Sequence, residues 1–327
     1  MKTLKLSAFA LVAFLAIGIS SCSDDDTTTT PTTPPVASIA AQAVANPNLS
    51  LLVKALTKAG LVQTLSDPGT YTVFAPTNTA FEAAGITSNY IDAQTSTTQI
   101  NDLKQVLLNH VLASKKASTD LVTGYVKTLA KGPASTTNNI DMFINTTGGV
   151  KFNGGASVVS GLININASNG IIHVVDKVIT LPTVVDLAVA NAAVFSSLTG
   201  ALTANGLVPT LQGTGPFTVF APTNDAFTAL TAELAAAGIT PTAAQLTSVL
   251  KYHVVSGNVL AANLPAVIAA GPVTTLNTQN FVISTSPSPN ITGSFAPART
   301  ASKIIKTDVQ GSNGVIHVLD KVLLPTL

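Results

Sequence analysis

Apolar residues in the stretch from 49 to 110 recur at the spacing of an α-helix. The apolar positions between Leu49 and Leu56 lie three or four residues apart, and Gly60 follows them as a stop signal. This pattern predicts an amphipathic helix over 49–59. A longer helix is predicted further along, with one face formed by Ile100, Leu103, Val106, Leu107 and His110.

Strand patterns surround and follow these helices. A short β-rich run predicts a strand over 70–75, and Pro76 ends it. Thr79, with Glu82 three residues later, fits a capping box for a short helix. From residue 127 onwards, Gly and Asn punctuate further strands, predicted at 140–144, 157–166 and 171–178. Helices in the first half and strands in the second predict an α+β domain with an antiparallel sheet system.

The sequence blocks of the first half of the chain recur in the second half. Residues 71–81 read YTVFAPTNTAF and residues 217–227 read FTVFAPTNDAF. Residues 169–179 read NGIIHVVDKVI and residues 313–323 read NGVIHVLDKVL. Such self-similarity is typical of tandem domains. Two domains are therefore predicted, over 36–182 and 183–327, with a boundary near a Leu-Pro pair that recurs at the end of the second copy.

The N-terminus has the pattern of an export signal. Lys2 and Lys5 precede an apolar run over 6–19, and small residues lead to Cys22, the only cysteine of the chain. A signal peptide over 1–21 is predicted, with Cys22 as the acylated residue of a bacterial lipoprotein. Acyl chains on this cysteine would hold the protein on a membrane. An ordinary secretory signal with an incidental cysteine remains the alternative.

Residues 22–35 cannot form a core and predict an extended tether. Three aspartates at 24–26 are followed by TTTTPTTPP over 27–35. The acidic run resembles the signal that sends some Bacteroidetes-type lipoproteins to the outer face of the outer membrane, although it also fits a plain solvated charge run. We expect a cell-envelope location, at the outer membrane and exposed at the surface.

Composition excludes several classes of function. Charged residues make up 9% of the chain, the formal net charge is +1, and Arg299 is the only arginine. Bidentate grips on phosphate or guanine are therefore scarce, so no nucleic-acid partner is expected. A single cysteine excludes an internal disulfide framework and a Cys-rich zinc site. The absence of tryptophan excludes a Trp-lined sugar cleft.

The four histidines are the residues with the most chemical potential. His173 with Asp176, and His317 with Asp320, could form metal or general-base sites together with His110 and His253. However, residues three apart on a strand face opposite sides, and His110 lies on the apolar face of a predicted helix. We expect structural histidines that donate to backbone carbonyls. No catalytic residue, metal or cofactor is expected, and no nucleophile elbow or phosphate loop occurs.

Two asparagines follow Pro-Thr at the start of a predicted helix. Asn78 and Asn224 have side chains that can satisfy the free N–H groups of a helix N-terminus. Capping is the preferred interpretation, and exposure in a ligand groove is the alternative.

Together these blocks resemble the fasciclin (FAS1) domain. Its first signature is similar to 72–78 and 218–224, its second to 169–178 and 313–322, and its central Tyr-His pair to Tyr252-His253. Asn109 stands where the family has Tyr, and Thr79 stands where Asp225 keeps the usual Asp. The resemblance implies two tandem FAS1-like domains, each a twisted β-sandwich-like core with helices packed on it.

The resemblance also implies adhesion or extracellular interaction in proteins that are mostly not enzymes. We expect a lipid-anchored surface protein that binds a protein or polysaccharide partner, and the alternative is a surface lipoprotein that binds glycans or small ligands. The candidate interaction residues are Tyr252, His253, Asn224, Asp225, Asn78 and His110. Because Asp225 and Tyr252 belong to the second domain, that domain is expected to carry more of the binding. The alternative is that both domains bind weakly and gain by multivalency.

Overall fold

The computed structural model describes residues 36–286, 288–293 and 300–326. The predicted signal peptide, Cys22 and the predicted tether lie outside these residues. Val36–Leu327 forms one compact unit. Below, residues 36–182 are called repeat 1 and residues 183–327 repeat 2. Within the described part of the chain, no helix has the length and apolar character that crossing a bilayer demands.

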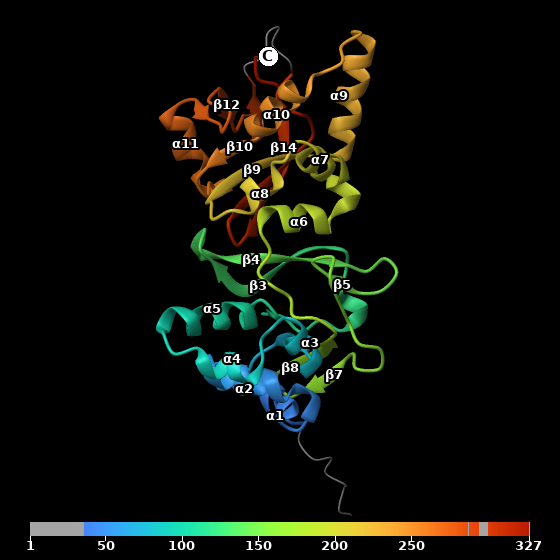
Figure 1. Cartoon of the computed structure of the whole chain (residues 1–327), viewed down its shortest axis with the longest axis vertical. Coiled ribbons are helices and arrows are strands. Elements are labelled where there is room, and N and C mark those ends of the chain that lie inside the picture. Colours follow the sequence, from blue (N-terminus) through green and yellow to red (C-terminus); the bar gives the residue numbers. More distant parts are fainter. Residues whose placement is uncertain (1–35, 287, 294–299, 327) are drawn as a thin grey trace, which may run out of the picture. The chain divides into compact units, whose positions relative to one another are not determined.

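Repeat 1 begins with helices, as predicted (Figure 1). The helix predicted over 49–59 is α2, Ser50–Lys58, and the longer helix is α5, Thr97–Leu108, which begins with a capping box at Ser96. The predicted cap at Thr79 is wrong, because the Thr77 side chain accepts from the Ala80 N–H. The other helical segments are α1 (Ile39–Val44), η1 (Pro47–Leu49), α3 (Asn78–Ala83), α4 (Ser88–Ala93) and η2 (Ser118–Asp120).

Two four-stranded sheets complete repeat 1. The first has the order β2-β1-β8-β7, and the second has the order β3-β4-β5-β6. In the first sheet, β1 and β8 are parallel, with Phe74 opposite His173. The strands are β1 (Tyr71–Pro76), β2 (Val111–Leu112), β3 (Gly124–Gly132), β4 (Ser135–Asn145), β5 (Lys151–Phe152), β6 (Ala156–Ser157), β7 (Ile165–Ala167) and β8 (Gly170–Val175).

Two strand predictions need correction. The sheet system is not wholly antiparallel, since its central pair is parallel and is joined by a crossover over residues 77–169. The single strand predicted over 157–166 consists only of the end of β6 and the start of β7. Between them, Gly161 and Asn164 have φ angles of 79° and 59°, which break an extended strand.

Repeat 2 keeps the parallel central pair of strands, but its described strands form one sheet instead of two. β9 and β15 are parallel, and seven strands join in the order β10-β9-β15-β14-β13-β12-β11. The helical segments are α6 (Val184–Ala190), α7 (Ala192–Ala204), α8 (Val208–Gln212), α9 (Asn224–Ala236), α10 (Ala243–Tyr252), η3 (Ala261–Asn263) and α11 (Leu264–Ala270). The strands are β9 (Phe217–Pro222), β10 (Val254–Ser256), β11 (Val273–Thr274), β12 (Asn280–Ser284), β13 (Asn290–Thr292), β14 (Ser302–Gly311) and β15 (Gly314–Leu319).

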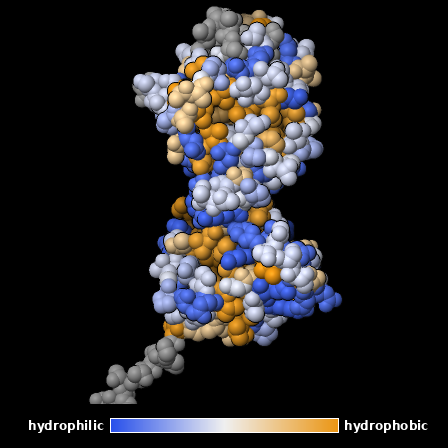
Figure 2. All heavy atoms as spheres, turned by 90° about the vertical axis from the view of Figure 1, so that its left-hand side faces the viewer, coloured by the Kyte–Doolittle hydropathy of each residue, from blue (hydrophilic) through white to orange (hydrophobic). Residues whose placement is uncertain are grey.

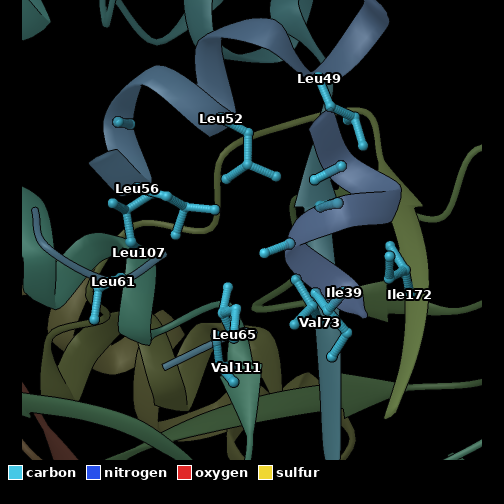
Figure 3. Close-up of a cluster of buried hydrophobic side chains, with 14 of the residues drawn as sticks. Ile39, Leu49, Leu52, Leu56, Leu61, Leu65, Val73, Leu107, Val111 and Ile172 are labelled. Carbon is cyan, nitrogen blue, oxygen red and sulfur yellow. The ribbon is translucent and has the colours of Figure 1, made fainter. Parts of the chain in front are cut away.

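The main core of repeat 1 lies between its helices and the first sheet. Figure 3 shows Leu52 and Leu56 of α2 pointing into a cluster with Leu107 of α5, Val73 of β1 and Ile172 of β8. All five side chains are buried. The helical spacing of the leucines places them on one face, and burial of that face fixes α2 on the sheet.

Helix α4 closes this core on its outer side. It begins at a Thr87 cap and packs on α2, and its Ile91 side chain is fully buried. At the surface, Lys54 Nζ of α2 forms an ion pair with Asp92 of α4 at 2.6 Å. Both charges are partly exposed, so the buried isoleucine contributes more to the position of α4 than the ion pair does.

Contacts between the two repeats centre on a buried carboxylate. Asp141 of β4 accepts a hydrogen bond at 2.6 Å from the Gln310 backbone N–H of β14, and another at 2.6 Å from Lys127 Nζ. Asp141 is only 4% exposed, and burial raises the pKa of its carboxyl despite the opposing effect of Lys127. Tyr125 OH also donates to Leu187 O at 2.9 Å.

We expect Ile91→Ala to lower the unfolding free energy by about 2–5 kcal/mol, because it leaves a cavity beneath α4. Urea unfolding of the 36–327 chain, followed by circular dichroism, measures this change. Val122→Ala is the control, since Val122 is 66% exposed and should cost less than about 0.5 kcal/mol. Equal losses in the two variants would contradict the assignment of α4 to the core.

Candidate functional site

The two repeated sequence blocks lie side by side in each repeat, as the parallel strands β1 and β8, and β9 and β15. Polar side chains of these strands bond inward. Thr72 is fully buried, donates to Ser114 O at 2.6 Å and accepts from the Lys116 N–H at 2.8 Å. Thr218 makes the equivalent pair of bonds with Gly257 and Val259. These threonines join the strand to the loop that follows the next strand in the sheet.

Asn78 and Asn224 bond to a helix other than their own. Asn78 Oδ1 accepts from the Leu51 N–H in the first turn of α2 at 2.9 Å, and its Nδ2 donates to Pro47 O. Asn224 Oδ1 accepts from the Ser197 N–H of α7 at 2.8 Å. The prediction that these asparagines satisfy free helical N–H groups fits Asn78, although the helix it caps is the preceding one rather than the one it begins.

A second pair of asparagines, quoted above only as part of a motif, ties distant segments together. Asn169 Oδ1 accepts from the Ile39 N–H at the start of α1, and its Nδ2 donates to Leu65 O and Asp67 O. Asn313 does the same with Val184, Leu211 and Gly213. Sequence reasoning missed this role, and the recurrence of Asn at the same motif position was its only signal.

His110 and His253 each link the end of a helix to the segment that leaves the sheet. The Ile179 N–H donates to His110 Nε2 at 2.8 Å, so Nδ1 carries the proton and donates to Val106 O at 2.8 Å. His253 repeats this arrangement with Leu323 and Val249, at 2.9 and 2.7 Å.

Both rings are therefore held neutral. Each ring has one donor and one acceptor nitrogen in use, which is the full capacity of a neutral imidazole. Burial lowers the pKa of His110 and of His253 to about 4, outweighing the opposing effect of the carbonyl that each ring donates to. A buried neutral ring with both nitrogens occupied has no free position for a metal or for proton transfer.

His173 and His317 are also buried and bonded. The Asn164 N–H lies 3.3 Å from His173 Nδ1, and His173 Nε2 donates to Lys116 O at 2.9 Å. His317 Nε2 donates in the same way to Val259 O at 2.8 Å. Burial lowers the pKa of both rings, and each ring stacks on a phenylalanine of the neighbouring strand.

The two motif aspartates lie apart from these histidines. Asp176 follows the end of β8, is exposed and accepts from the Ser157 N–H at 2.7 Å. Asp320 accepts from the Lys303 N–H at 2.7 Å. Each carboxylate bonds to the backbone of a nearby strand, and the predicted pairs, His173 with Asp176 and His317 with Asp320, are not hydrogen-bonded to each other. Within the residues that the structure describes, no three His, Cys, Asp or Glu side chains gather as a metal site.

Three of the six candidate interaction residues are buried. Tyr252 is fully buried and donates from its hydroxyl to Asn280 O at 2.7 Å, and His253 is 2% exposed. His110 is equally buried. Direct contact between these side chains and a partner is therefore incompatible with the folded structure. Asn109, which stands where Tyr252 stands in repeat 2, is also buried and donates to Ile179 O and Thr180 O.

Asp225 is the candidate residue that lies fully in the open. It is exposed in the first turn of α9, beside the partly buried Asn224. A carboxylate at a helix N-terminus is favourable, and its outward side is free to meet a partner. In repeat 1 the corresponding Thr79 is exposed but uncharged.

The framework described above is found in a known family. The family model described as the fasciclin domain matches residues 47–182 and 193–325. The chain belongs to the fasciclin family. The two matched stretches fall in repeats 1 and 2, and the predicted pair of FAS1 domains is confirmed.

Relatives of this fasciclin chain are found in bacteria and animals. It is 38% identical over 146 residues to Protein sll1483 of Synechocystis sp., covering 44% of this chain and 74% of that protein. It is 27% identical over 262 residues to transforming growth factor-beta-induced protein ig-h3 of Sus scrofa, covering 80% of this chain. The match spans 35% of the length of that animal relative.

One solved structure of a domain pair is similar to this chain. It is a FAS1 domain pair from the insect cell adhesion molecule Fasciclin I, with 16% sequence identity and a TM-score of 0.44. The similarity covers 87% of this chain and 95% of that one.

We expect the stability of the fold to decline as the pH falls from 6.5 to about 4. In that range the unfolded chain binds protons on histidines that stay neutral in the folded state, so acid favours unfolding. Each of His110 and His253 can contribute a slope of up to about 1.4 kcal/mol per pH unit. Above pH 6.5 both histidines are neutral in the folded and in the unfolded state, so they no longer make the stability depend on pH.

Urea unfolding at several pH values, for the wild type and His253→Gln, measures this slope. The raised pKa of Asp141 acts in the opposite direction in both proteins, so the difference between them isolates His253. The variant should be less stable at pH 7 and less sensitive to acid. An unchanged slope would show that His253 is not buried as a neutral ring.

We also expect His173→Ala and His317→Ala each to lower the unfolding free energy by about 1–3 kcal/mol, through a lost hydrogen bond and a cavity. Denaturant unfolding measures the loss, and elemental analysis of the wild type provides an independent check. Stoichiometric metal in the wild type that disappears with either substitution would overturn the structural assignment.

Proposed function

We propose that this protein is a lipid-anchored adhesion protein of the cell surface, which binds matrix or envelope components and has no enzymatic activity. Membership of the fasciclin family supports the proposal, as does the export signal predicted at the N-terminus. Fasciclin I, whose FAS1 pair is similar to this chain, is an insect cell adhesion molecule.

The observation that carries the proposal is the use of the motif side chains. The buried threonine, asparagine and histidine side chains of both repeats form hydrogen bonds with backbone groups inside the same fold. A fold held in this way offers a broad, rigid outer surface to a partner. Figure 2 shows one face of that surface, where hydrophobic residues (orange) gather in patches between hydrophilic ones (blue).

Such a surface favours contact with a macromolecule. Large hydrophobic side chains are exposed singly in both repeats, among them Val122, Val189 and Ile305. With 9% charged residues, long-range electrostatic attraction is weak, and contact depends on close complementarity. A pull-down from the native cell envelope with the 36–327 chain, together with a glycan array, tests the proposal. Binding to glycans alone would favour the glycan-binding alternative.

We expect Cys22→Ala to release the protein from the membrane fraction or to leave it unprocessed. Cys22 is the only cysteine and follows the apolar run of the predicted signal peptide. Fractionation of cells that express wild type and variant, followed by immunoblotting, measures the distribution. Normal cleavage with unchanged membrane retention would contradict the predicted lipid anchor.

We expect repeat 2 to carry more of the adhesion, through the exposed carboxylate of Asp225. Asp225→Thr should lower binding of the 36–327 chain to envelope material several-fold. The free energy of unfolding should change by less than about 1 kcal/mol in this variant and in the reciprocal variant Thr79→Asp, because that is the usual size of a helix-terminus charge effect. Thr79→Asp is the matched reciprocal variant, and it should maintain or increase binding. Unchanged binding by Asp225→Thr would place the adhesive surface elsewhere.

A further inference from the structure

Repeat 2 has an apolar groove between α9 and α10. Its volume is about 560 Å³, and its lining comes from three helices, the loop between α9 and α10, and Leu324 of the segment that follows β15. Among its lining residues are Phe227, Leu230 and Leu234 from α9, Leu246 and Val249 from α10, and Ala201 from α7. The polar residues that line it, such as Thr231 and Gln245, carry no charge.

Repeat 1 shows what the same positions look like when they are covered. Leu246 lies seven residues before His253, as Leu103 lies seven residues before His110. Leu103 is 4% exposed, whereas Leu246 is 37% exposed.

Two more pairs of equivalent residues show the same difference in exposure. Phe81 and Ala55 of repeat 1 are fully buried, and their counterparts Phe227 and Ala201 are only partly buried. Three positions that are buried in the core of repeat 1 are thus more exposed in repeat 2.

The cause lies in the chain between the two helices. Both repeats carry the sequence AGIT, at 84–87 and at 237–240. In repeat 1, residues 88–95 come between this sequence and the Ser96 cap of α5, and they include α4. In repeat 2, Pro241 alone separates it from the Thr242 cap of α10. Repeat 2 therefore has no counterpart of α4.

Helix α9 forms one wall of the space that remains. It is 13 residues long, and its counterpart α3 is six. The added two turns bring Leu230 and Leu234 alongside the groove. The longer α9 therefore extends the apolar wall of the groove, and it does not fill the groove as α4 does in repeat 1.

We propose that this groove binds a short amphipathic helix of a partner protein, which inserts an aliphatic side chain where repeat 1 holds Ile91. In repeat 1 the covering element is a six-residue helix with Ile91 fully buried and Tyr90 46% exposed. An apolar groove between helices is a common receptor for such a helix. The inference stands apart from the adhesion proposal, because Asp225 lies at the start of α9 and does not line the groove.

The charges specify the partner further. In repeat 1, Asp92 of α4 is held by Lys54 Nζ, and its carbonyl accepts from Lys58 Nζ. The corresponding residues of repeat 2 are Gly200 and Ala204. The groove therefore has no cation at these two places, and the partner helix is held by its apolar face, without need of an acidic residue.

Fluorescence polarisation with the 36–327 chain tests this. The probe is a labelled, hydrocarbon-stapled helical peptide with the sequence of residues 87–94, TSNYIDAQ. Saturable binding is expected. The peptide change Ile91→Ser should weaken it at least tenfold, because the anchor is lost. The peptide change Asp92→Ala should alter it by less than twofold.

Matched protein variants locate the site. Leu246→Lys should weaken peptide binding at least tenfold, and Ile239→Lys, at the 54% exposed edge of the groove, provides a second test should the first variant fail to fold. Val122→Lys, an equally drastic change at an exposed position of repeat 1, should leave binding within twofold.

Several results would overturn the proposal. One is the absence of saturable binding, and another is binding that Leu246→Lys and Ile239→Lys leave intact. Self-association of the 36–327 chain that Leu246→Lys abolishes would make a second copy the occupant. Binding by the 36–327 chain that is lost in the full chain would make residues 1–35 the occupant.

Discussion

The structure depends on the parallel pairing of the first and last sequence blocks of each repeat. β1 runs beside β8 from Tyr71 opposite Gly170 to Pro76 opposite Val175, and β9 runs beside β15 in the same way. Everything between the two strands is a crossover that must fold back over this pair. His110 fixes the position of the helical part of the crossover, because its ring bonds both to the end of α5 and to Ile179, which follows the sheet.

Local elements could be predicted because their signals are local. The spacing of leucines in α2 and the β-rich run of β1 each reflect neighbours within a few residues. The parallel pairing could not be predicted in this way, since no local pattern tells a strand its partner. The cap at Thr77 was missed for a related reason: Thr77 and Thr79 both fit the cap preference, and the local sequence does not select between them.

The candidate site shows a different limit. His253 and Asn224 recur in both repeats, and Tyr252 belongs to the family signature, which drew attention to all three. However, such motifs contain framework and binding residues alike. Burial separates the two classes, and burial depends on the whole fold. Tyr252 is fully buried, whereas Asp225 is exposed. The groove of repeat 2 was missed because its signal is a segment that is lacking, the counterpart of α4, and this shows only when both repeats are laid side by side.

The pairing of β1 with β8 also has a consequence in time. Tyr71 finds its partner only after Gly170 has been synthesised, so a nascent repeat cannot complete its central sheet until nearly all of it has left the ribosome. Contacts this distant along the chain slow folding and leave unpaired strand edges open in the interval. The export proposed above would benefit from this delay, since a polypeptide that stays unfolded during synthesis can still be threaded through a membrane. The order of the strands thus delays completion of the fold until the repeat has been synthesised.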